Sequence, residues 1–159
     1  MGPVPMASAD QLARIRPFDR LTPAHQSLIA TTARDVNFPE GATIFSDGQP
    51  AVGCWLIRAG HVALGTEVPG RGQVVVQTLG PGEVLGWSWL VPPYHWHFTA
   101  VASTEVSAVE FDTARLRALA DSDPALGYPL SLGFFEIVVA RLQHTRSRLL
   151  DLYGSPRDR

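Results

Sequence analysis

The sequence predicts a mainly β fold, a double-stranded β-helix or jelly roll, flanked by helices and followed by a long C-terminal helix. Between residues 35 and 111, apolar residues alternate with a period of two, and turn signals rich in glycine and proline recur at short intervals. About eight short strands with such turns are typical of a double-sheet jelly roll or barrel. Outside this region, apolar residues recur at spacings of three and four, which predicts helices.

The composition indicates one folded domain without a dominant charge. The chain has 159 residues, of which 45% are hydrophobic and 18% charged, and its formal net charge is −2. This length is enough for a single core, and the charge gives no general attraction to nucleic acid or to a membrane surface. The one cysteine, Cys54, excludes a disulfide framework within the chain and is expected to be a small core residue.

The sequence also leads us to expect a cytoplasmic protein. Residues 1–10 lack the basic and apolar segments of a secretory signal. No run of about 18 apolar residues is found, so no membrane span is expected.

The chain before the roll is expected to be a flexible N-terminus over residues 1–9 and helices over residues 10–34. A short helix from residue 9 ends at Pro17. A second helix begins at Thr22, a residue type that caps helices, followed by proline. The roll then occupies residues 35–111, with strands expected at 36–38, 43–45, 54–57, 61–65, 74–79, 100–102 and 106–111.

Two helices are expected over residues 112–153, and residues 154–159 form a tail. Asp112 caps the first, and the second begins at Asp123–Pro124. In the second helix, apolar residues at alternating spacings of three and four form a coiled-coil seam, weakened only at Thr145. The seam residues are Phe135, Val138, Leu142, Leu149 and Leu152. They either cover the helix's own roll or pair with a second copy. We favour pairing, because the apolar side chains continue past the length that one roll could cover.

Residues 86–102 hold the densest chemistry of the chain. They contain three of the four tryptophans, Trp87, Trp89 and Trp96, together with the histidines His95 and His97. Exposing this aromatic area to water costs about 25 cal/mol per Å². The stretch therefore either lines a pocket or fills one, and after Pro92–Pro93 it is expected to continue as an alternating strand.

Four segments of the sequence, taken in order, point to a known family. They are Phe38–Gly48 (FPEGATIFSDG), Leu56–Val62 (LIRAGHV), Leu79–Gly86 (LGPGEVLG) and Ala102–Leu119. The chain resembles the cyclic nucleotide-binding domain found in the effector half of Crp/Fnr-type regulators and in regulatory subunits of kinases and channels. The resemblance covers nearly residues 10–150 and implies a β-roll flanked by helices. The family's turns need glycines at Gly41, Gly48, Gly60, Gly82 and Gly86.

The chain departs from this family at the residues that hold the nucleotide. In the family, a short helix begins with a glycine–glutamate pair whose glutamate binds the ribose 2′-hydroxyl, and an arginine on the next strand pairs with the cyclic phosphate. Here Gly86 matches the glycine, but Trp87 stands at the glutamate position and Trp96 at or next to the arginine position. A cyclic phosphate requires a charge-assisted donor. We therefore expect ordinary cAMP binding to be lost or badly weakened.

The resemblance defines a candidate ligand site of aromatic character, and the inherited position favours pocket walls over filler. The predicted ligand-binding residues are Gly82, Gly86, Trp87, Ser88, Trp89, Leu90, Trp96, His97 and Thr99. No resident cofactor is expected, although a nucleotide or another small effector is compatible with the site. His95 and His97 alone provide too few metal ligands, and Ser88 lacks the glycine that a nucleophile elbow needs.

The resulting hypothesis is a non-enzymatic sensor or regulatory module that forms a homodimer through its C-terminal helix. Its partners would be a small-molecule effector or a protein. No direct DNA binding is expected, since the sequence given stops at Arg159 before any helix-turn-helix. The alternative is a ligand-free interaction or dimerisation module on the same fold, in which the tryptophans plug the cavity.

Overall fold

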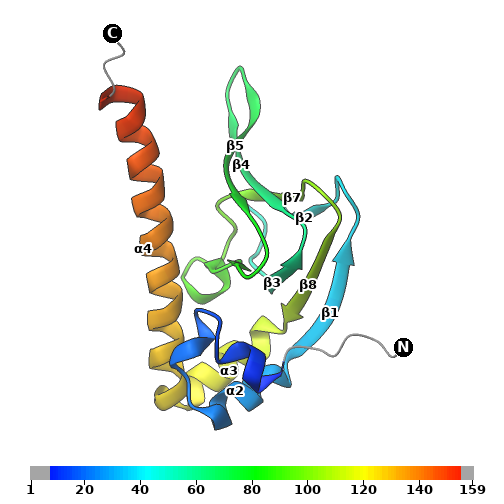
Figure 1. Ribbon diagram of the computed structural model, residues 1–159, viewed down its shortest axis with the longest axis vertical. Helices are drawn as coiled ribbons and strands as arrows, with labels where there is room; N and C mark the ends of the chain where they lie inside the picture. Colours follow the sequence, from blue (N-terminus) through cyan, green and yellow to red (C-terminus); the bar gives the residue numbers. More distant parts are fainter. Residues whose placement is uncertain (1–7, 155–159) are drawn as a thin grey trace.

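Two four-stranded antiparallel sheets form the centre of this computed structural model, which describes residues 8–154 (Figure 1). Their strand orders are β1-β8-β3-β6 and β2-β7-β4-β5. The strands are β1 (Ala33–Phe38), β2 (Thr43–Phe45), β3 (Cys54–Ala59), β4 (Val62–Val68), β5 (Gly72–Leu79), β6 (Val84–Leu85), β7 (Thr99–Ala102) and β8 (Val106–Phe111). The predicted jelly roll is thereby confirmed.

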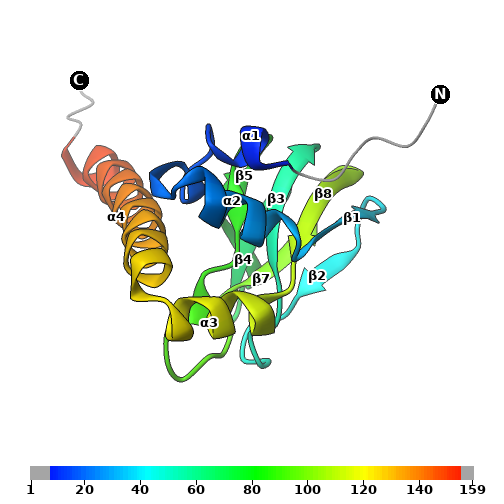
Figure 2. The ribbon, with the colours of Figure 1, turned by 90° about the horizontal axis from the view of Figure 1, so that it is seen from below.

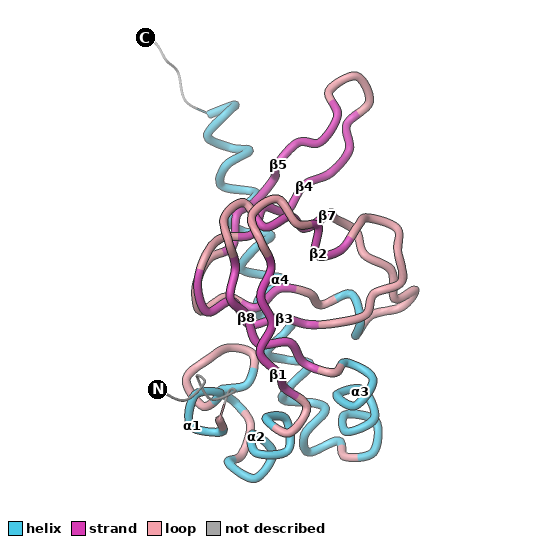
Figure 3. Tube along the Cα trace, turned by 90° about the vertical axis from the view of Figure 1, so that its right-hand side faces the viewer, coloured by secondary structure: helices cyan, strands magenta, loops and turns pink. Residues whose placement is uncertain are grey.

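The helices gather at one end of the roll, except for the last one, which runs along its side (Figures 2 and 3). They are α1 (Ala9–Leu12), the 3₁₀ turn η1 (Phe18–Arg20), α2 (Pro23–Ala30), the 3₁₀ turn η2 (Ser88–Leu90), α3 (Thr113–Ser122) and α4 (Pro124–Gly154). The long C-terminal helix that the sequence predicts is thus present.

Side chains predicted as caps begin two of these helices. The Thr22 hydroxyl accepts a hydrogen bond from the N–H of His25 at 3.2 Å. One carboxylate oxygen of Asp112 accepts from the N–H groups of Ala114 and Arg115. These bonds satisfy backbone donors that have no partner inside the helix.

Three predicted boundaries are wrong. The helix expected to reach residue 34 ends at Ala30, because the hydroxyls of Thr31 and Thr32 bond back to the carbonyls three residues earlier, and β1 begins directly afterwards. The first helix ends at Leu12 rather than near Arg16. Residues 94–98, expected as a strand, form a loop with one isolated bridge, and β7 begins at Thr99. Residues 1–7 and 155–159, which hold most of the predicted flexible ends, lie outside the described residues.

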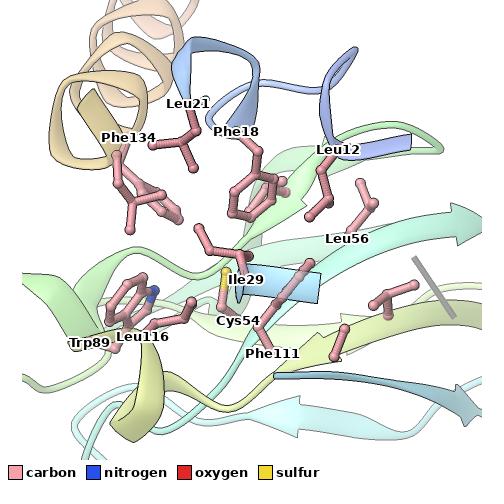
Figure 4. Packing of buried hydrophobic residues seen from close by; sticks show 14 of the residues in the cluster. Leu12, Phe18, Leu21, Ile29, Cys54, Leu56, Trp89, Phe111, Leu116 and Phe134 are labelled. Carbon is pink, nitrogen blue, oxygen red and sulfur yellow. The ribbon is translucent and has the colours of Figure 1, made fainter. Parts of the chain in front are cut away.

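Buried side chains form two separate cores. The helical core lies between the helices and the outer face of one sheet, and Figure 4 shows it from close by. Its aromatic members are Phe18, Trp89, Phe111 and Phe134. The roll core lies between the two sheets and includes Phe45, Trp55, Ile57, Leu64, Leu85 and Trp96. The roll core occupies the place where a pocket was predicted.

The first half of α4 is fixed against the helical end of the molecule. Leu126, Leu130 and Phe134 are buried in the helical core. Gly133 lies so close to Pro17 that an added Cβ would be 2.5 Å from the proline carbonyl oxygen. The small residue therefore permits a close approach that fixes the direction of α4 along the roll.

We predict that replacing Gly60 by alanine destabilises the roll more than the same change at Gly70. Both glycines have a left-handed backbone, with φ of +87° and +82°. An added Cβ at Gly60 would lie 2.1 Å from the carbonyl oxygen of Glu105, whereas nothing lies within 4 Å at Gly70. We expect Gly60→Ala to lower the free energy of unfolding by about 2 kcal/mol more than Gly70→Ala, because it adds overpacking to the same backbone strain. Urea denaturation measures both, and equal losses would contradict this packing of the β3–β4 turn.

Candidate functional site

The space between the two sheets is filled by four aromatic rings, which we call the aromatic cluster: Phe38, Phe45, Trp55 and Trp96. The ring of Trp96 stacks on Phe45 with centroids 3.8 Å apart and planes 12° from parallel. Trp55 lies 5.8 Å from Phe45 and 6.1 Å from Trp96, and Phe38 meets Trp55 edge-on. Trp96 is only 4% exposed. It is therefore an interior residue of the roll.

Backbone hydrogen bonds between two loops hold Trp96 in place. The backbone N–H of Trp96 donates to the carbonyl of Gln49 at 2.9 Å, and its carbonyl accepts from the N–H of Gly48 at 2.8 Å. Two residues earlier, the Tyr94 carbonyl accepts from the N–H of Ala51 at 2.8 Å. The indole is thus directed between the sheets by pairing of residues 94–96 with residues 48–51.

Gly86 allows the end of β6 to approach this indole closely. Its φ is +99°, and an added Cβ would lie 3.2 Å from both the Gly53 carbonyl oxygen and the Trp96 ring. A side chain here would be strained and crowded. Gly86 therefore helps to close the space around Trp96.

The cavity that remains beside the aromatic cluster has a volume of about 20 Å³. This is room for about one water molecule. Five of the nine predicted ligand-binding residues line it: Gly86, Trp87, Ser88, Trp96 and His97. These five residues therefore lie together around one small cavity, and in this conformation the region is filled rather than open.

The other four predicted residues do not line this cavity. Trp89 is 1% exposed and lies in the helical core, where its ring meets Phe134 edge-on (Figure 4) and its indole N–H donates to the Gly86 carbonyl at 3.0 Å. Leu90 packs against the same core. The Gly82 N–H donates to a carbonyl of β3, and the Thr99 hydroxyl accepts from the N–H of Asp47 at 3.1 Å. The contacts of these four residues support the fold.

At the position where the family has a glutamate, the wall of the cavity is an aromatic pair. Trp87 is half-buried and stacks on His97, with ring centroids 5.9 Å apart. His95 points elsewhere, since its Nδ1 lies 2.8 Å from the Pro93 carbonyl oxygen. Within residues 8–154, no three His, Cys, Asp or Glu side chains are grouped so that they could hold a metal ion. The pair therefore offers stacking surface in place of a carboxylate.

Cys54 is a buried core residue, as predicted. It lies on β3 in the helical core, and burial raises the pKa of its thiol to about 12. The thiol is neutral at physiological pH and packs as a small apolar group.

Arg141 of α4 reaches the cavity although it is distant in the sequence, and sequence reasoning missed it. It is the one arginine of the described residues that lines the cavity, and its guanidinium donates to the carbonyl of Val84. Burial lowers the pKa of Arg141, and the neighbouring Glu83 acts against this. One feature of the sequence could have pointed to Arg141. Arg141 and Arg148 are seven residues apart, beside the predicted seam and on one face of the helix.

The jelly roll is followed by a long final helix, and the segment between β6 and β7 lies where the family binds its ligand. This arrangement defines a regulatory domain of the cyclic nucleotide-binding type. The chain belongs to the cyclic nucleotide-binding domain family, whose pattern its residues 35–123 match. The family expected from the sequence is thereby confirmed.

The relatives of the chain are regulators and nucleotide-binding domains. It is 28% identical over 141 residues to a CRP-like cAMP-activated global transcriptional regulator of Mycobacterium tuberculosis, covering 89% of this chain and 61% of that protein. It is 28% identical to the HTH-type transcriptional regulator Cmr of the same organism, over 82% of this chain and 51% of that protein. The chain thus spans little more than half the length of these relatives.

Among solved structures, the chain is similar to a putative cyclic nucleotide-binding protein from Geobacter metallireducens. The TM-score is 0.77 at 32% identity, and the match covers 86% of this chain and 99% of that one. A cyclic nucleotide-binding domain from Methylobacillus flagellatus shares the fold, with a TM-score of 0.75 at 19% identity over 87% of this chain and 78% of that one.

Proposed function

We propose that this chain is a non-enzymatic regulatory module that does not bind cAMP in the family's usual way, because its own aromatic side chains occupy the pocket. The observation that carries this proposal is the position of Trp96, which leaves a cavity of only about 20 Å³. The family's carboxylate and guanidinium are both replaced by indoles, since Trp87 stands at the glutamate position and Trp96 at or next to the arginine position. This favours the ligand-free interpretation over the open aromatic pocket that the sequence suggested.

Energetics support the loss of nucleotide binding. A nucleotide could enter only if Trp96 left its stack on Phe45. Removing a buried tryptophan side chain from a core costs about 3–5 kcal/mol. Since each 1.4 kcal/mol is a factor of ten, a ligand that displaced Trp96 would lose at least about a hundredfold in affinity. The charged contacts that could offset this loss are missing at positions 87 and 96.

A second candidate function is a sensor for a small effector bound in the divergent pocket. One observation favours it: the Trp87–His97 wall is only partly buried, so it could move without disrupting the roll core. In that case the predicted ligand-binding residues nearest the cavity would contact the effector, with Trp87, Ser88 and His97 foremost.

We predict no binding of cAMP or cGMP by the purified chain. Titration with either nucleotide should leave the intrinsic tryptophan fluorescence and the melting temperature unchanged, because Trp87 and Trp96 would report any entry into the pocket. The cAMP-activated relative from Mycobacterium tuberculosis serves as the positive control in the same assay. A saturable change at micromolar cAMP would refute the proposal, and a change with a different small molecule would favour the sensor.

The same module is proposed to form a homodimer through the seam of α4. The seam residues Phe135, Leu142 and Leu149 are 63%, 66% and 52% exposed, and Leu152 is 81% exposed. A continuous apolar seam exposed to water is typical of a helix that pairs with another helix. Val138 lies on the same seam and is half-buried. The interaction surface of the module is therefore proposed to be this face of α4.

The apolar character of α4 is also compatible with a membrane-spanning helix. By length and composition, α4 is long and apolar enough to cross a membrane, with a mean hydropathy of 1.4 over its most apolar stretch. This differs from the expectation of no such segment. However, Leu126, Leu130 and Phe134 at its start are buried in the helical core. Only 28% of that apolar stretch is buried, and we assign its exposed apolar residues to the proposed dimer seam. We therefore propose a cytoplasmic module with no membrane contact and no direct DNA contact through its described residues.

We predict that aspartate substitutions in the seam produce a monomer. The double variant Leu142→Asp/Leu149→Asp places charges where the two helices would meet, and each lost leucine removes roughly 2 kcal/mol of apolar burial. Sedimentation equilibrium should give a dimer for the wild-type chain and a monomer for the variant, with unchanged circular dichroism because both leucines are exposed in one copy.

Ser147 provides the matched control, because it lies on the opposite face of α4 from the seam and is exposed. Ser147→Asp should remain dimeric. A wild-type chain that is monomeric at every concentration, or a control variant that dissociates like the double variant, would contradict dimerisation through this seam.

A further inference from the structure

A second cavity lies between α4 and the roll, with a volume of about 360 Å³. Its walls come from β5, from the turn before β6, and from one face of α4. It shares only Arg141 with the small cavity beside the aromatic cluster. It is therefore a separate site, outside the position where the family binds its nucleotide.

Three basic side chains of α4 line one wall of this cavity. Arg141, His144 and Arg148 are spaced by three and four residues and share one helix face. Arg141 donates to the Val84 carbonyl, and Arg148 donates to the Val76 carbonyl at 3.0 Å. On the opposite wall, Gln77 and Thr78 of β5 add an amide and a hydroxyl. Hydrogen-bond donors thus face the cavity from both sides.

The charges around this cavity do not balance. Neither Arg141 nor Arg148 belongs to an ion pair within residues 8–154. Glu83 is the one carboxylate in the lining, and its Oε2 accepts from the Gly80 N–H at 2.9 Å. A guanidinium has five donors, so a single carbonyl contact leaves others that can bind a further acceptor. Two arginines face one carboxylate, so the lining carries a net positive charge.

We propose that this cavity binds a polyanion of the diphosphate class, with Arg141 and Arg148 holding its two charged ends. Two arginine side chains that line one cavity suit an anion with two charged groups better than a single phosphate or carboxylate. His144 and Thr78 also line the cavity and would donate to the same anion. The bound anion would replace carbonyl contacts that now attach α4 to the roll.

Isothermal titration calorimetry with inorganic pyrophosphate, at constant ionic strength and without divalent cations, tests this proposal. The wild-type chain should bind one pyrophosphate per chain, at least tenfold more tightly than inorganic phosphate. Arg148→Gln should weaken binding by about tenfold or more, because it removes charge-assisted hydrogen bonds. Arg148 is exposed, so this variant should fold even if Arg141→Gln does not.

Arg146→Gln is the matched control, because Arg146 is an exposed arginine on the same helix that does not line the cavity. It should change the affinity by less than twofold. A parallel titration with ADP distinguishes a nucleoside diphosphate from diphosphate alone: tighter binding of ADP assigns the former and equal binding the latter. The absence of saturable pyrophosphate binding, or equal weakening by Arg146→Gln and Arg148→Gln, would overturn the site. Either result is independent of the cAMP titration, which concerns the other cavity.

Discussion

The stacking of Trp96 on Phe45 determines what the interior of this roll can do. The two rings lie 3.8 Å apart between the sheets, and Trp55 and Phe38 extend the contact. The loop around Gly48, the left-handed Gly86 and the bridge at Pro50 all hold Trp96 in this position. An interior filled in this way contributes to stability as a core does, and the cavity beside it has a volume of only about 20 Å³.

The family fold is retained, and we propose that its binding chemistry is replaced. The two sheets and their turns match a cyclic nucleotide-binding domain, whereas the segment between β6 and β7 supplies the core side chains Trp89 and Trp96. Two surfaces of α4 are available for interaction: an exposed apolar seam on one face and basic residues on another. Arg141 touches both cavities, so the helix and the roll are physically connected at this residue.

Much of the fold could be predicted because local signals agreed with the global structure. Thr22 and Asp112 cap helices as expected, and the turn glycines adopt positive φ. Other features depended on long-range contacts. The alternating pattern of residues 94–98 indicated a strand, but the segment pairs with a loop instead. Trp89 and Trp96 are seven residues apart and enter different cores, which no local pattern reveals. Arg141 meets Val84, 57 residues away, for the same reason.

The most direct test of the filled pocket is whether indole can rescue the variant Trp96→Ala. Removing this side chain should lower the free energy of unfolding by about 3–5 kcal/mol and leave an apolar cavity. Added indole should occupy that cavity and raise the melting temperature of the variant in a saturable way. It should have no such effect on the wild-type chain or on Trp87→Ala, whose indole is only half-buried. A loss below about 1 kcal/mol, with no response to indole, would show that Trp96 does not fill the roll.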